Sequence, residues 1–147
     1  MKALTIWQPW AALIMARAKP WEWRGWKPPR YLVGQRLVIH AGARKVPKHE
    51  IVQLLRDIRA GDTSLVADKA LAVLDATRVD GFLLACGLGT ALVGEPINAA
   101  DWAARHNAPG HDSDRVDHHM WGWPLSDIRA FPAPVPMRGA QGLWEWP

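Results

Sequence analysis

The segment from Leu4 to Arg24 constrains the fold most, because two prolines interrupt it within a short length of chain. Residues 2–7 are mostly apolar or β-branched and predict a first strand. Pro9 suits the first turn of a helix, where its missing N–H costs nothing. Pro20 ends that helix and favours extended geometry around it. The segment therefore predicts a strand, a short helix and a second strand in close succession.

Charged and aromatic side chains alternate at the end of this segment. A strand period of two over residues 21–24 places Glu22 and Arg24 on one side and two tryptophans on the other. Lys19 stands just before this strand. Charges interleaved with large rings suit a pocket for a flat polar ligand. The alternative is a surface cluster of ion pairs, which would contribute little to stability.

Composition narrows the class of protein. The chain has 147 residues, 49% of them hydrophobic and 22% charged, and we expect one domain over residues 1–147. The single cysteine, Cys86, excludes an internal disulfide and fits a reducing compartment. We see neither a signal peptide nor an apolar run long enough for a membrane span. We therefore expect a cytoplasmic protein with no membrane partner, and we favour a monomer.

Basic residues are concentrated near the N-terminus. The net charge is +4, and nine of the 18 Lys and Arg residues lie between Arg17 and Lys48, with Glu22 the only acid among them. Such a block favours contact with a phosphate backbone or another anion. The chain also has ten tryptophans, whose flat rings can stack on bases. A solvated basic face remains the plainer alternative.

Periodicity predicts the remaining elements. The clearest strand is 36–41, and an amphipathic helix runs over 47–60 up to Gly61. Other helices are expected at 64–76 and, as one turn, at 100–105. Other strands are expected at 82–86, 90–97, 121–131 and 142–146, with glycines 87 and 89 joining the first two and prolines 132, 134 and 136 separating the last two. Short strands with inserted helices predict an α+β fold, a small mixed β-barrel decorated by helices.

Residues 98–119 are polar and irregular, and they predict a loop that closes over a ligand. Part of this loop is rich in histidine and aspartate, but its spacing matches no strong metal-binding motif. We therefore predict no metal and no other cofactor. The residues concerned are His111, Asp112, Asp114, Asp117, His118 and His119.

Motifs spread along almost the whole chain resemble the ASCH domain family, a branch of the PUA-like β-barrels. Residues 17–24, RAKPWEWR, resemble its signature G-x-K-x-x-E-x-R, with arginine in place of the leading glycine. Residues 4–11, LTIWQPWA, are similar to its opening L-S-I-x-Q-P-W-A. Residues 31–41 resemble its Y-x-G-x-L-x-I-H-A strand, and residues 121–144 resemble its closing segment.

The resemblance implies a PUA-like barrel with a cleft near Lys19, Glu22 and Arg24, which we call the charged triplet. It also implies a ligand related to RNA or to a modified nucleoside. Members of the family are described as RNA-binding modules, as ribonucleases and as amidohydrolases that remove the acyl group from N4-acylated cytidine. Our leading hypothesis is the amidohydrolase. The alternative is an RNA-binding module or a metal-independent ribonuclease that uses the same basic cleft.

The resemblance also assigns roles within the cleft. Glu22 occupies the position where the amidohydrolase branch carries a threonine nucleophile, and a carboxylate there suits activation of water or pairing with Lys19. Lys19 would move protons or polarise the acyl oxygen, and Arg24 would hold the oxyanion or orient Glu22. Thr5 is the fallback nucleophile if it lies beside Lys19. The candidate substrate-binding residues are Trp7, Trp23, Trp26, Tyr31 and His40. Core packing is the alternative for each aromatic residue, and a hydrogen bond to the backbone is the alternative for His40.

Overall fold

The computed structural model describes residues 1–108, 118 and 120–147. None of the helices in this part of the chain is long and apolar enough to cross a membrane. The described elements are, in chain order, β1 (Lys2–Ile6), α1 (Trp10–Met15), β2 (Trp21–Arg24), the 3-10 turn η1 (Arg30–Leu32), β3 (Arg36–Ala41), α2 (Lys48–Ala60), α3 (Ala67–Asp80), β4 (Cys86–Val93), β5 (Ile97–Asn98), α4 (Ala99–His106), β6 (Trp121–Pro136) and β7 (Leu143–Glu145).

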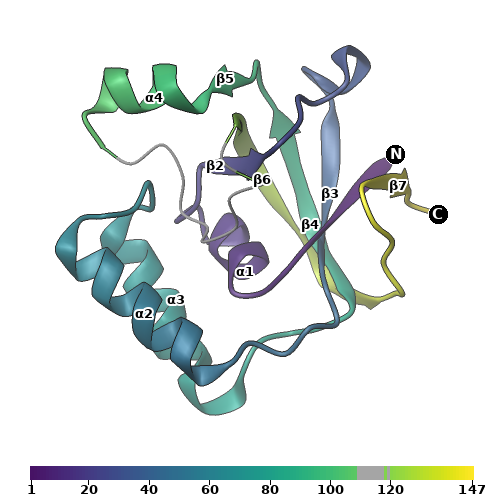
Figure 1. Cartoon of the computed structure of the whole chain (residues 1–147). Helices are drawn as coiled ribbons and strands as arrows, with labels where there is room; N and C mark the ends of the chain where they lie inside the picture. The colour runs from purple at the N-terminus through teal and green to yellow at the C-terminus, as the bar shows by residue number, and fades with distance from the viewer. Residues whose placement is uncertain (109–117, 119) are drawn as a thin grey trace.

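The described strands form one curled, mixed sheet in the order β2-β6-β4-β3-β1-β7, with β5 paired to β6. β1 pairs with β3 in parallel, and the other pairs of described strands are antiparallel. A parallel pair needs a crossover, and the segment that carries α1, β2 and η1 supplies it. The antiparallel helices α2 and α3 lie together on one side, with α1 between them and the sheet (Figure 1). The α+β class expected from the sequence is confirmed.

Helix α1 connects the two main hydrophobic clusters because it is buried on two faces. Ala11 and Ile14 pack into the core of the sheet. Leu13 points the other way and packs with Leu54 of α2 and Leu74 of α3. A six-residue helix has little stability of its own. Burial on both faces therefore holds α1, and through it the chain on either side, in a fixed place.

The two strands expected at 82–86 and 90–97, joined or bent at glycines 87 and 89, form one strand with narrower bounds, because β4 runs continuously from Cys86 to Val93. Its glycines allow close approach instead of ending the strand. A Cβ at Gly87 would lie 2.4 Å from the Trp146 ring, and one at Gly89 would lie 2.3 Å from the Arg129 carbonyl oxygen. The register of β4 against β6 shifts between the two glycines.

Strand β6 also extends beyond its predicted end at residue 131, up to Pro136. Proline lacks the N–H that a ladder needs, so it is tolerated in a strand only where that N–H would be unpaired. The prolines alternate at positions 132, 134 and 136, so their nitrogens face one edge of β6. Val135 pairs with Gly87 of β4, whereas the pairs with β2 and β5 are confined to residues 121–124.

The other boundaries differ modestly from expectation. Helix α3 starts and ends later than the predicted 64–76. The expected turn at 100–105 is the helix α4, and together with β5 it occupies the first part of the segment predicted to be a loop. Asn98 caps α4 by accepting a hydrogen bond from the backbone N–H of Ala100. Residues 109–117 and 119 of the expected loop lie outside the described residues.

The close approach at Gly89 gives a stability prediction. We expect Gly89→Ala to lower the free energy of unfolding by about 3 kcal/mol, the upper end for overpacking, because the new methyl group would meet the β6 backbone. Gly61→Ala is the control, since its Cβ would meet no atom within 4 Å and only the left-handed φ of 75° is strained; we expect about 1 kcal/mol there. Urea unfolding measures both. Equal losses would contradict the packing argument.

Candidate active site

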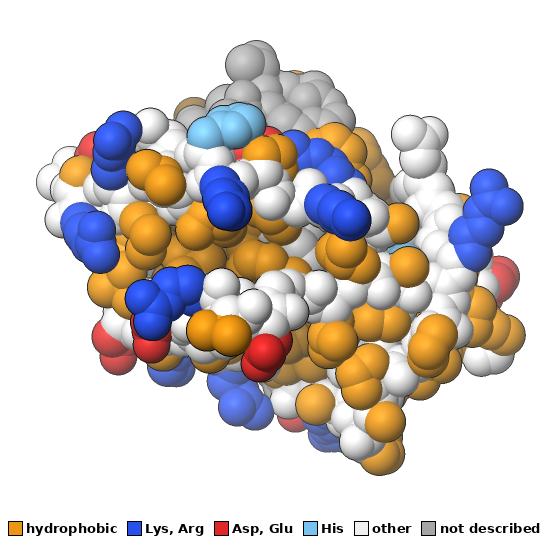
Figure 2. Space-filling view, turned by 90° about the horizontal axis from the view of Figure 1, so that it is seen from below, with side chains coloured by type: hydrophobic (Ala, Val, Ile, Leu, Met, Phe, Trp, Pro, Cys, Tyr) orange, Lys and Arg blue, Asp and Glu red, His pale blue; other side chains and the backbone are white. Residues whose placement is uncertain are grey.

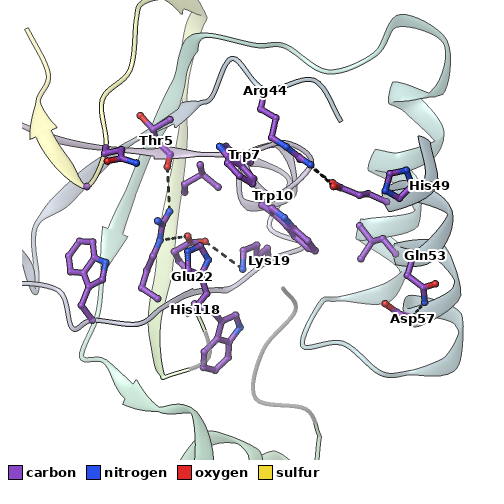
Figure 3. A pocket seen from close by; sticks show the side chains of 18 of the residues that line it. Thr5, Trp7, Trp10, Lys19, Glu22, Arg44, His49, Gln53, Asp57 and His118 are labelled. Atoms are coloured by element: carbon purple, nitrogen blue, oxygen red, sulfur yellow. Dashed lines mark hydrogen bonds and ion pairs between the residues drawn. The ribbon is translucent and has the colours of Figure 1, made fainter. Parts of the chain in front are cut away.

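A pocket of about 970 Å³ lies between the curled sheet and α2 (Figure 3). One wall comes from β1, α1 and β2, and the opposite wall comes from the 42–47 loop and α2. Residues 140–142 close a third side. This volume is at the upper end of the range for ligand pockets in proteins. On the face seen in Figure 2, a hollow with hydrophobic side chains inside it has Lys and Arg side chains around its edge.

The charged triplet lies in the sheet-side wall of this pocket. Lys19 and Glu22 are only 3% and 4% exposed. The Lys19 Nζ is 3.6 Å from the Glu22 Oε2, and the Arg24 Nε donates a hydrogen bond of 2.8 Å to the Glu22 Oε1. Lys19 also donates to the Trp21 carbonyl oxygen at 2.6 Å. The Glu22 carboxylate therefore bridges two cations that come from the same short segment of chain.

The alternation of β2 separates this triplet from an aromatic cluster. Glu22 and Arg24 face the pocket, whereas Trp21 and Trp23 stack at 6.1 Å on the other side and pack edge-on against Trp102 of α4. β2 is held in place by antiparallel pairing with β6. The period-two expectation for residues 21–24 is confirmed. The three charged side chains have little exposure. The alternative of an ion-pair cluster at the surface, which would contribute little to stability, therefore does not apply.

Three tryptophans on the wall keep part of their ring surface open. Trp7 is 42% exposed and Trp26 is 39% exposed, and both line the pocket as expected for binding candidates. Trp10 packs against both main hydrophobic clusters and also lines the pocket, and the Lys19 Nζ lies 5.6 Å from its ring centroid. Large open rings beside buried charge are suited to stacking on a flat polar ligand.

The other three binding candidates have different surroundings. Trp23 is 1% exposed and donates its Nε1–H to the Ser64 Oγ at 3.3 Å, although it borders the pocket. Tyr31 is 61% exposed on η1, and His40 is 1% exposed on β3. Neither is among the described residues that line the pocket. The structure thus brings Trp7 and Trp26 to the triplet but not Tyr31 or His40.

Thr5 lines the pocket, and its hydroxyl is held by two neighbours. It accepts a hydrogen bond of 3.1 Å from the Trp144 Nε1–H and lies 3.2 Å from the His40 Nδ1. The His40 Nε2 is 2.8 Å from the Met137 carbonyl oxygen, which can only accept. A neutral His40 therefore donates from Nε2 and accepts the Thr5 hydroxyl hydrogen at Nδ1. Through its backbone carbonyl, Thr5 also accepts from the Arg24 Nη2 at 3.4 Å.

The α2 wall carries functional groups that the sequence reasoning missed. His49, Gln53 and Asp57 lie on its pocket side (Figure 3). Arg44 stacks its guanidinium 4.5 Å from the Trp7 ring and forms an ion pair with Glu50, whose pKa is lowered chiefly by that hydrogen bond. The periodicity of α2 marks this polar side only as the face opposite its apolar stripe. Nothing in that pattern distinguishes a pocket from open solvent.

No group of three or more His, Cys, Asp or Glu residues is placed to hold a metal ion within the described ranges. Of the histidine and aspartate cluster singled out in the sequence, His118 is described and lines the pocket. The remaining members lie outside the described residues: His111, Asp112, Asp114, Asp117 and His119.

Comparison with known proteins agrees with this architecture. The family model of the ASCH domain matches residues 4–88, which is more than half of the chain. The crystal structure of ASCH from Zymomonas mobilis is similar over 99% of this chain and 87% of that one, with a TM-score of 0.56 and 12% sequence identity. That likeness concerns the fold. A search of curated proteins finds no significant match. The chain therefore belongs to the ASCH domain family, and its curled sheet is of the PUA-like kind.

Proposed function

We propose that this protein is an amidohydrolase that removes the acyl group from N4-acylated cytidine or a closely related modified nucleoside. The observation that carries the proposal is the burial of Lys19 and Glu22 in the wall of a pocket, with Arg24 beside them at 14% side-chain exposure. Burying charged groups is costly unless they serve each other or a ligand. Titratable groups paired in a cleft are a common feature of catalytic sites.

The pocket suits a nucleoside in size and chemistry. A volume of about 970 Å³ holds a base, a sugar and a short acyl group, and the open rings of Trp7, Trp10 and Trp26 offer faces for a pyrimidine. Lys19 lines the same wall, and the proposal sets its ammonium group against the acyl oxygen. Family membership supports an RNA-related ligand but does not choose among the activities described for the family.

In the proposed reaction a water molecule attacks the acyl carbon while the Glu22 carboxylate takes up its proton. The negative charge that develops on the acyl oxygen is stabilised by the Lys19 ammonium. The carbon–nitrogen bond then breaks, and the amine at N4 receives the proton from Glu22. The products are cytidine and a carboxylic acid. The aminopyrimidine ring delocalises charge, so its departure needs less acid assistance than that of an alkyl amine.

The geometry favours one of the two expected roles for Arg24. Its Nε donates to the Glu22 Oε1 and its Nη2 to the Thr5 carbonyl oxygen, so it is well placed to orient the carboxylate. The Thr5 hydroxyl, in turn, is engaged with Trp144 and His40. We therefore propose direct attack by water, with Glu22 as the base, rather than an acyl-threonine intermediate.

We expect the purified protein to convert N4-acetylcytidine to cytidine. The change in ultraviolet absorbance as cytidine forms measures the rate. Glu22→Gln and Lys19→Met should each lower kcat/KM at least about a hundredfold, the usual contribution of a general acid or base. Glu95→Gln is the matched control, because its carboxylate pairs with Arg30 at an exposed site outside the pocket. An inactive native protein, or a Glu22→Gln variant as active as the control, would refute the assignment.

The alternative is an RNA-binding module or a metal-independent ribonuclease, and the basic residues support it. Arg44 and Arg56 border the pocket, and half of the Lys and Arg residues lie between Arg17 and Lys48. A module without chemistry would bind RNA through several of these cations, and its affinity would fall steeply with salt. It would not depend on Glu22.

We expect unmodified single-stranded RNA to stay intact when it is incubated with the protein in the presence of a chelator and then run on a denaturing gel. A ribonuclease would instead yield fragments, and Lys19→Met and Glu22→Gln would abolish them. Such cleavage, together with failure to act on N4-acetylcytidine, would replace the proposed function with the alternative.

A further inference from the structure

Helix α2 presents a polar stripe to the pocket, on the wall opposite the triplet (Figure 3). His49, Gln53 and Asp57 are spaced by four residues, so they lie along one side of the helix. Leu54 and Ile58 are buried on another side, where they pack in the cluster shared with α1 and α3. The stripe is therefore held at a fixed distance from the triplet by the packing behind it.

One member of the stripe is an oriented carboxylate. The Gln53 Nε2 donates a hydrogen bond of 2.9 Å to the Asp57 Oδ1, which favours one orientation of the carboxylate. Within the described part of the chain, Gln53 is the hydrogen-bond partner of this carboxylate, and no Lys or Arg forms an ion pair with it. Its remaining lone pairs are available to hydroxyl donors in the pocket.

The neighbouring charged groups on this wall are less suited to that role. The Glu50 oxygens are both bonded to the Arg44 guanidinium. Arg56 and Arg44 carry only donors and would bind anions instead. A carboxylate that faces a nucleoside across a pocket is complementary to the two adjacent hydroxyl groups of a ribose, which it can bind with charge-assisted hydrogen bonds.

We propose that Asp57, oriented by Gln53, binds the 2′- and 3′-hydroxyl groups of the substrate, and that the enzyme therefore selects ribonucleosides over 2′-deoxyribonucleosides. The proposal rests on the proposed function, since the base of the substrate must lie against the tryptophans and its acyl group against Lys19 and Glu22. The sugar then extends across the pocket to α2. A deoxynucleoside lacks the 2′-hydroxyl donor and so forms one charge-assisted hydrogen bond fewer with Asp57.

The test compares kcat/KM for N4-acetylcytidine and N4-acetyl-2′-deoxycytidine. We expect the native protein to prefer the ribonucleoside by about tenfold to a hundredfold, the range for one hydrogen bond to a charged group. Asp57→Asn and Asp57→Ala should bring this ratio close to one, because they remove two hydrogen bonds from the ribonucleoside and only the 3′-hydroxyl contact from the deoxynucleoside. A loss of stability in the variant would not change the ratio of the two kcat/KM values, because it lowers the amount of folded protein equally for both substrates. Asp75→Asn on α3 is the matched control and should keep the native ratio, since Asp75 does not line the pocket.

A native ratio near one, or an unchanged ratio in both Asp57 variants, would overturn the inference and leave the proposed function intact. If neither substrate is hydrolysed, the proposed function is wrong. The inference about ribose recognition can then still be tested by measuring nucleoside binding. Quenching of tryptophan fluorescence by cytidine and by 2′-deoxycytidine gives the two dissociation constants. Tighter binding of cytidine that disappears in Asp57→Asn would support ribose recognition, and equal binding to the native protein would refute it.

Discussion

The Glu22 carboxylate, held between Lys19 and Arg24 at a buried position, is the interaction on which the rest of the site depends. A carboxylate with so little exposure needs opposite charge nearby, because the free-energy cost of removing it from water exceeds the attraction to a single distant cation. Both cations come from the same short segment. Arg24 adds a connection to β1 through the Thr5 carbonyl oxygen, so the triplet links β2 to a strand near the other end of the sheet's strand order.

The sheet, helix α1 and the α2–α3 pair each contribute differently to the pocket around the triplet. The sheet and the aromatic cluster of Trp21, Trp23 and Trp102 hold β2 from behind. Helix α1, buried on two faces, sets the distance between the sheet and the α2–α3 pair. The pocket occupies the space left between these layers, so its two walls carry different chemistry. In our proposal the sheet wall performs the reaction and the α2 wall recognises the sugar.

Much of the fold follows from local sequence patterns. The strands at 2–6 and 36–41 and the helix α2 lie where alternation or helical periodicity predicted them. Tertiary contacts explain both β4 and β6. The prolines at 132, 134 and 136 predict an interruption, yet β6 continues through them because their nitrogens face an edge that is unpaired among the described strands. The glycines within β4 lie where the Trp146 ring and the β6 backbone leave no room for a side chain.

By itself, the sequence determined that Glu22 and Arg24 share one side of β2, because a period of two within one strand places side chains without any long-range information. It also indicated the α+β class and the family. Only the tertiary structure decided which aromatic residues reach the pocket, placing Trp10 there and leaving Tyr31 and His40 outside its lining. It alone brought Asp57 opposite Glu22. Residues so far apart in the chain come to line one pocket only through the packing of α1 against α2, which no local sequence pattern predicts.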